Sequence, residues 1–146
     1  MEIPFNEKCI EKEGKFPIFT LKENNREWRA MNQNYICCCS VQIDGVIFKD
    51  DVKKCDKGLI TEDNRFYLVE LKGCDVEQAC KQLLITYETF SKKYKNYEYF
   101  CRAVVSKMPS GKAAPKLLGA SYRKLQKKLN SKNKLIYKSV LLEEKI

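Results

Sequence analysis

The sequence predicts one α/β domain with a mixed β-sheet flanked by helices, in the order β-β-β-α-β-α-β. Three observations predict this fold class. β-Prone runs fill much of residues 35–72, an amphipathic helix pattern follows them, and strand and helix patterns then alternate towards the C-terminus. Hairpins join antiparallel strands and helical crossovers join parallel ones, so the sheet should be mixed. The length of 146 residues suits one hydrophobic core.

The first half of the chain supplies the expected hairpins. Residues 35–43 (YICCCSVQI) are β-prone and lead into a turn at Asp44-Gly45. After a charged loop, two further strands are expected at 56–61 and 65–72, joined by a turn-like Glu-Asp-Asn. These runs predict the antiparallel part of the sheet.

The hydrophobic period then changes to that of a helix. Asp75 is placed to cap the helix N-terminus, and Gln78 stands at the capping-box position. The expected buried stripe consists of Val76, Ala79, Cys80, Leu83, Leu84, Tyr87 and Phe90. Such a helix predicts a crossover to a parallel strand.

The last part of the chain predicts one more strand, helix and strand. Residues 97–106 are β-prone and precede a loop that contains proline and glycine. A helix is expected at about 115–129 and a closing strand at 135–142. The inward side of this helix should carry Leu118, Tyr122, Leu125 and Leu129.

The whole chain, 1–146, therefore reads as one domain in three parts. Residues 1–34 form a poorly defined N-terminal segment, within which the polar stretch 22–29 is typical of a connection or a short turn. Residues 35–107 hold most of the sheet and the first helix, and residues 108–146 hold a basic loop, a helix and the last strand.

The positive charge is concentrated in the C-terminal third. The net charge is +9, yet residues 1–98 hold 16 basic and 17 acidic side chains, whereas residues 99–142 hold 11 basic and no acidic ones. A one-sided basic surface suits a polyanion such as nucleic acid, although a solvated lysine-rich helix without a partner gives the same pattern. The candidate nucleic-acid contacts are Lys107, Lys112, Lys116, Arg123, Lys124, Lys127 and Lys128.

The eight cysteines are not arranged as a metal site. No two of them form a Cys-x-x-Cys pair and the chain has no histidine, so we expect no zinc but buried, reduced thiols. No stretch is apolar enough to cross a membrane and the N-terminus does not resemble a secretory signal, so a cytoplasmic protein is expected. The lack of histidine also removes the commonest general base.

The most informative segment is the strand RFYLVELKG. Alternation places Glu70 and Lys72 on the same face as the apolar Phe66 and Leu68, where a charge is costly unless it is paired or binds something. Asp56 opens the preceding strand, 14 residues upstream of Glu70. Three other acid-x-lysine tripeptides in the chain lack this apolar strand and the helix after it.

On these residues the sequence resembles the PD-(D/E)XK nuclease superfamily, with its restriction-endonuclease-like core. The likeness covers residues 35–107: Asp56 in KCDKGLI, Glu70 and Lys72 in YLVELKG, and the helix directly after. Cys55 stands where the family name has proline. The resemblance implies a Mg²⁺-dependent endonuclease, with Mn²⁺ as a substitute and DNA favoured over RNA as substrate.

The resemblance also implies roles for single residues. Asp56 and Glu70 would bind the metal, together with the backbone carbonyl of Leu71. Lys72 would orient the attacking water or stabilise charge on the phosphate, and Gln82 would lie at the edge of the site. Some members carry a further acid on an N-terminal helix, for which Glu7 and Glu11 are equal candidates here.

Other interpretations of the same residues remain open. Glu70 and Lys72 could be an ion pair on an exposed strand, and Asp56 could cap a turn. The protein could bind nucleic acid without cleaving it, or its lysines could meet an acidic protein partner. Nothing in the sequence supports or excludes a homodimer.

Overall fold

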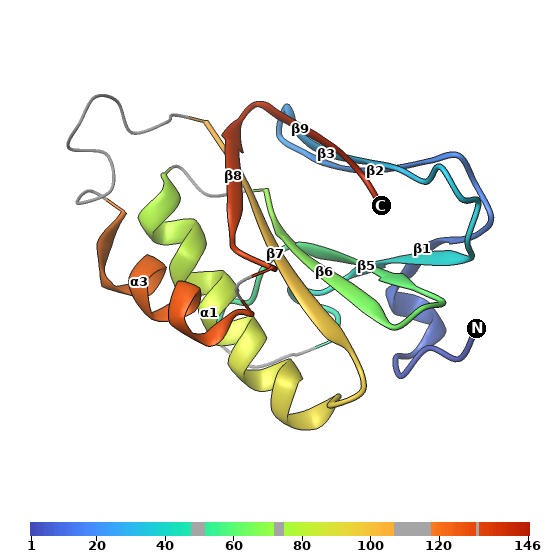
Figure 1. Cartoon of the computed structure of the whole chain (residues 1–146), viewed down its shortest axis with the longest axis horizontal. Helices are drawn as coiled ribbons and strands as arrows, with labels where there is room; N and C mark the ends of the chain where they lie inside the picture. Colours follow the sequence, from blue (N-terminus) through green and yellow to red (C-terminus); the bar gives the residue numbers. More distant parts are fainter. Residues whose placement is uncertain (48–51, 72–74, 107–117, 131) are drawn as a thin grey trace.

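A computed structural model describes residues 1–47, 52–71, 75–106, 118–130 and 132–146 (Figure 1). Its centre is a six-stranded sheet in the order β1-β4-β5-β6-β7-β8. The strands β1, β4, β5 and β6 pair antiparallel, and β6, β7 and β8 pair parallel, so the sheet is mixed as predicted. The bounds are β1 (Ile10–Gly14), β4 (Cys38–Gln42), β5 (Lys57–Thr61), β6 (Arg65–Glu70), β7 (Glu98–Val105) and β8 (Ile136–Ser139).

Two helices cover one face of this sheet, α1 (Val76–Lys93) and α3 (Gly119–Lys128), which pack against each other (Figure 1). Asp75 caps α1 as expected, because its side chain accepts a 2.8 Å hydrogen bond from the backbone N–H of Gln78. The predicted inward side chains of both helices lie in one apolar cluster with the facing side chains of the sheet, Tyr87 and Tyr122 at its margin. This cluster is the larger of two hydrophobic cores.

A second, three-stranded sheet packs on the opposite face. It consists of β2 (Ile18–Glu23), β3 (Arg26–Met31) and β9 (Leu141–Lys145), with β3 in the middle. Its apolar side chains form the second core with side chains of β4 to β7, and Trp28 is wholly buried there. The protein is therefore a single α/β domain in three layers: helices, a six-stranded sheet and a three-stranded sheet.

The sequence left residues 1–34 poorly defined, whereas the structure gives this segment regular elements. This segment forms β1, β2 and β3 and a short 3₁₀-helix at Glu7–Cys9. Within the stretch expected to be a connection, only Asn24 and Asn25 form the turn, with positive φ angles of 47° and 64°. These angles suit asparagine and match a tight hairpin. Glu11 lies in β1, not on a helix, and its carboxylate pairs with Lys57 at 2.6 Å.

The single closing strand predicted at 135–142 was confirmed only in part, since β8 closes one edge of the six-stranded sheet but the strand ends at Ser139. The predicted residues divide between β8 and β9, which belong to different sheets. The chain changes sheet at Val140, whose φ of 66° is unusual for a β-branched residue. The backbone of Val140 bonds to both layers, since its N–H donates to Val105 and its carbonyl accepts from Glu27.

The other element predictions were confirmed within the described residues apart from small shifts of their ends, and the expected start of the last helix at about 115 lies outside them. The cysteines of the described residues are free, and all of them except Cys37 are buried. Within the described part of the chain, no helix is long and apolar enough to cross a membrane.

Candidate functional site

Strand β6 divides its side chains between the two cores as alternation predicts. Phe66 and Leu68 face the helices, whereas Tyr67, Val69 and Leu71 face the three-stranded sheet. The same alternation turns Glu70 towards the helices. Its exposed fraction is 0%, so a carboxylate ends β6 inside the protein.

Asp56 lies beside this strand end and is also buried, with 1% of its surface exposed. Its Oδ2 accepts a 2.6 Å hydrogen bond from the backbone N–H of Leu71, the residue after Glu70. Its own backbone carbonyl accepts from the N–H of Ile43 at 3.0 Å. The pairing of β5 with β6 and these two bonds hold Asp56 in place from both sides.

Both carboxylates act on the thiol of Cys55, which is buried between them and helix α1. Burial raises its pKa well above 9.0, and the negative charges of Glu70 and Asp56 raise the pKa further. Helix α1 fixes this position, because the backbone N–H of Cys55 donates a 2.8 Å bond to Oγ1 of Thr86. The two acids thus converge at the point where β5, β6 and α1 meet.

Gln82 completes this group from α1. When its amide is oriented to satisfy its neighbours, Nε2 donates to Oε2 of Glu70 and, at 3.3 Å, to the backbone carbonyl of Lys54. Gln82 therefore contacts one of the two acids directly. The structure brings together Asp56, Glu70 and Gln82, while Lys72 lies outside the described residues.

The carbonyl oxygen of Leu71 has a partner from the other layer. Arg26, the first residue of β3, donates to it from Nη1 at 3.0 Å, and its Nη2 donates to Oγ of Ser106 at 3.0 Å. The guanidinium thus bridges the carboxyl ends of the parallel strands β6 and β7. Ligands of open α/β sheets bind at such strand ends.

Sequence reasoning missed two basic residues near the acids. Arg26 fell within the expected connection, and the turn at Asn24-Asn25 between alternating apolar residues is the signal that could have revealed its hairpin. Lys54 fell within the charged loop, yet it is only 3% exposed and lies two residues before Asp56. Its Nζ donates to the Val52 carbonyl at 3.2 Å.

The expected basic surface is described in part. Four of its residues lie on α3 and are exposed: Arg123, Lys124, Lys127 and Lys128. Glu88 of α1 lies within 3.7 Å of the Lys124 ammonium and 3.3 Å of the Lys128 ammonium, which reduces the local positive charge. The other three predicted contacts, Lys107, Lys112 and Lys116, lie outside the described residues.

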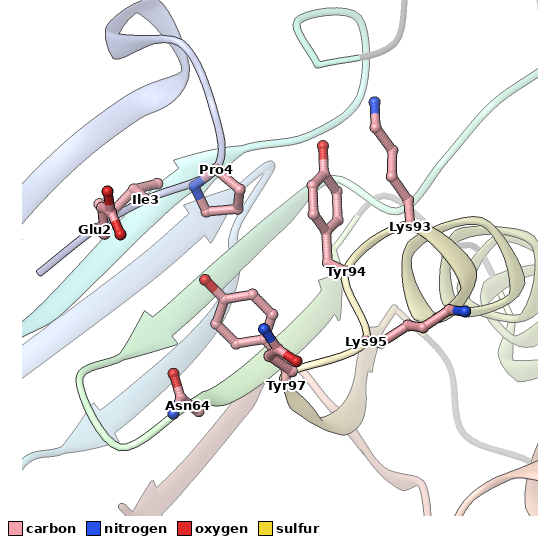
Figure 2. Close-up of a pocket in the computed structure, with 9 residues that line it drawn as sticks. Glu2, Ile3, Pro4, Asn64, Lys93, Tyr94, Lys95 and Tyr97 are labelled. Atoms are coloured by element: carbon pink, nitrogen blue, oxygen red, sulfur yellow. The ribbon is translucent and has the colours of Figure 1, made fainter.

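A cavity of about 590 Å³ lies away from these acids (Figure 2). Its lining includes the N-terminal residues Glu2 to Pro4, Asn64, and 93–97 between α1 and β7. It therefore adjoins the start of β6, whereas Glu70 ends that strand. Figure 2 shows the ammonium groups of Lys93 and Lys95 pointing in different directions, so they do not converge on one ligand. None of the predicted site residues that the structure describes lines this cavity.

The donor atoms near Asp56 fit a hard divalent cation in kind. Carboxylate and carbonyl oxygens are the ligands that Mg²⁺ prefers, and it commonly takes only one or two protein carboxylates with water. Within the described part of the chain, no group of three or more acidic or thiol side chains is placed to hold a metal. A metal here would therefore rest on Asp56 and Glu70, with the Leu71 carbonyl shared with Arg26.

No family model, curated protein or solved structure matches the chain. The class that fold and site define is thus an α/β domain with two buried acids at the carboxyl end of its central parallel strands. Function must be argued from this geometry.

Proposed function

We propose that this protein is a metal-dependent endonuclease of the PD-(D/E)XK type, with a restriction-endonuclease-like core. The observation that carries the proposal is the hydrogen bond from the Leu71 N–H to Asp56, which places this buried carboxylate at the end of β6, next to the buried Glu70. Burying two like charges together is costly unless each is paired or coordinates a metal, and a bound cation serves both acids at once. The order of elements supports it, because α1 crosses from β6 to the parallel strand β7.

Asp56 and Glu70 would hold Mg²⁺, or Mn²⁺ in its place. When bound, the metal would act as a Lewis acid and lower the pKa of a bound water. The described residues prepare this site. The Leu71 N–H fixes one oxygen of Asp56, and Gln82 orients Glu70. Lys72 would orient the water or stabilise charge on the phosphate.

The substrate would be nucleic acid, DNA before RNA, contacted through its phosphates by the basic residues of α3 and of the preceding loop. Such contacts set the position of the duplex without reading its sequence. α3 supports this role because it packs on α1, the helix that supplies Gln82. Free thiols in the described residues suit a reducing compartment, and we place the protein in the cytoplasm.

The test separates cleavage from binding. Divalent-metal-dependent nicking should disappear in Asp56→Ala, Glu70→Ala and Lys72→Ala, while each variant still binds nucleic acid. Wild-type activity that survives all three changes would rule out this site. Salt-sensitive binding with no cleavage under any divalent metal would indicate a noncatalytic nucleic-acid-binding protein. Co-purification with one acidic protein, and no affinity for DNA or RNA, would indicate a protein-interaction function.

A further inference from the structure

Arg26 is placed to serve the candidate site although it belongs to another layer of the fold. Its guanidinium reaches from β3 to the Leu71 carbonyl and to Ser106, across 45 and 80 residues of sequence. The Leu71 carbonyl belongs to the residue between Glu70 and Lys72. A permanently positive group therefore binds the residue whose N–H holds Asp56, and it reaches this strand end from the side of the three-stranded sheet.

This guanidinium is incompletely satisfied. Arginine has five N–H donors, and hydrogen bonds to two neutral acceptors use one on each terminal nitrogen. The Nε–H is buried and has no hydrogen-bond partner among the described residues. None of the ion pairs between described residues includes Arg26, in contrast to Arg29 in the same strand, which pairs with Glu27 and Glu143.

The position remains open to a ligand. Ser106 is exposed and Arg26 is half-buried, at the carboxyl ends of β6 and β7. A planar guanidinium with spare donors matches the paired oxygens of a phosphate. The carboxylates at this edge would otherwise repel a polyanion: Asp56, Glu70 and also Glu23, which is the cross-strand partner of Arg26 in the β2–β3 hairpin.

We infer that Arg26 binds a backbone phosphate of the nucleic-acid substrate next to the acid pair; this inference rests on the proposed nuclease function. Its hydrogen bonds to Leu71 and Ser106 hold the guanidinium flat across the two strand ends. One phosphate then contacts the remaining donors of both terminal nitrogens. Arg26 is thus a substrate-binding residue contributed by the three-stranded sheet.

The test measures binding without metal, so that it does not depend on turnover. Binding of a short DNA duplex is measured in EDTA over about 50 to 200 mM salt. Arg26→Gln should lower affinity about tenfold and reduce the slope of log affinity against log salt by about 0.9, the value for one phosphate contact. Arg26→Lys should keep the slope because it keeps the charge.

Arg29→Gln is the matched control, since it removes the same charge from the same strand and should leave the slope unchanged. An unchanged slope in Arg26→Gln, an equal loss in Arg29→Gln, or no binding by the wild-type protein would each overturn the inference. If Arg26→Gln does not fold, phenylglyoxal modification of the wild-type protein replaces it. DNA should then protect Arg26 and not Arg29, and equal modification of Arg26 with and without DNA contradicts the inference.

The two proposals fail differently. Cleavage that depends on Glu70, together with a normal salt slope in Arg26→Gln, would support the nuclease proposal and contradict the phosphate contact at Arg26. A reduced salt slope in Arg26→Gln, with no cleavage by the wild-type protein in any metal, would support the phosphate contact and contradict the nuclease proposal.

Discussion

The backbone N–H of Leu71 donates a 2.6 Å hydrogen bond to Oδ2 of Asp56, and this bond joins one candidate acid to the strand that carries the other. It explains how two acids 14 residues apart in the sequence meet in the interior. It also gives Asp56 a structural task that can be separated from its charge.

Two substitutions of Asp56 should separate its structural hydrogen bond from the negative charge that cleavage requires. Asp56→Ala leaves the buried Leu71 N–H without its acceptor, which should lower the free energy of unfolding by about 1–3 kcal/mol. Asp56→Asn keeps an amide oxygen in the same place and should lose less. Both variants should lose cleavage, since neither has the carboxylate. Urea unfolding measures the difference, and equal destabilisation by the two changes would argue against the hydrogen bond.

Gln82 should matter for activity more than for stability. Its amide contacts Glu70 and the Lys54 carbonyl, so Gln82→Leu should reduce cleavage about tenfold or more by freeing the carboxylate to rotate. Gln78→Leu, one helical turn earlier on the exposed side of α1, is the matched control and should change cleavage little. The two rates are compared under single-turnover conditions. Equal cleavage rates for both variants would contradict a role of Gln82 in the site.

The strained backbone at Val140 predicts an unusual stabilising change to glycine. Valine at a φ of 66° costs about 1–2 kcal/mol, whereas glycine adopts this angle freely at an entropic cost of about 0.5–1 kcal/mol. The side chain is 57% exposed, so little packing is lost. Val140→Gly should therefore raise the free energy of unfolding by up to about 1 kcal/mol.

The control for Val140 is Val52→Gly, because Val52 is 49% exposed and does not have a positive φ. There the same change should destabilise the protein. If both variants unfold at the same denaturant concentration, strain at Val140 is not the cause of any gain.

How much of this could be predicted from the sequence is clearest in β6. Period-two alternation correctly placed Phe66 and Leu68 on the same face, because a strand has only two sides. The N-cap at Asp75 was equally predictable, since capping is a local hydrogen bond.

The missed features depend on contacts between distant segments. Strand β9 pairs with β3, more than 100 residues away, so nothing local to residues 141–145 separates them from β8. The bond from Arg26 to Leu71 is of the same kind and has no local signature in the sequence. The convergence of Asp56 and Glu70 was accessible only through resemblance and the order of elements.

The buried thiols predict that the protein loses stability in alkali. Burial raises the pKa of Cys80, and separately of Cys101, to about 12 from 9.0. Because each thiol has a higher pKa in the folded state, its contribution to the free energy of unfolding is complete below about pH 9. It is lost as the pH rises towards 12, because the unfolded chain releases its proton first. The loss should approach about 1.4 kcal/mol per pH unit for each thiol.

Urea unfolding at about pH 7.5, 8.5 and 9.5 measures this effect, with a steeper decline expected above about pH 9. Cys80→Ala should be less stable throughout, because packing is lost, but its decline with pH should be shallower. A free energy of unfolding that stays flat to about pH 9.5, or an identical decline in Cys80→Ala, is the contrary result.

The central claim is that Asp56 and Glu70 form a metal-dependent centre that cuts phosphodiester bonds. The most direct measurement is cleavage of mixed DNA and RNA substrates as Mg²⁺ is raised from zero, with the wild-type protein and Glu70→Gln compared. Glu143→Gln, an exposed acid paired with Arg29, is the matched control. We expect saturable cleavage, DNA before RNA, by the wild-type and control proteins and a loss of at least about a hundredfold in Glu70→Gln. Cleavage that is equal in all three proteins, or no cleavage by the wild-type protein at any Mg²⁺ concentration, would contradict the claim.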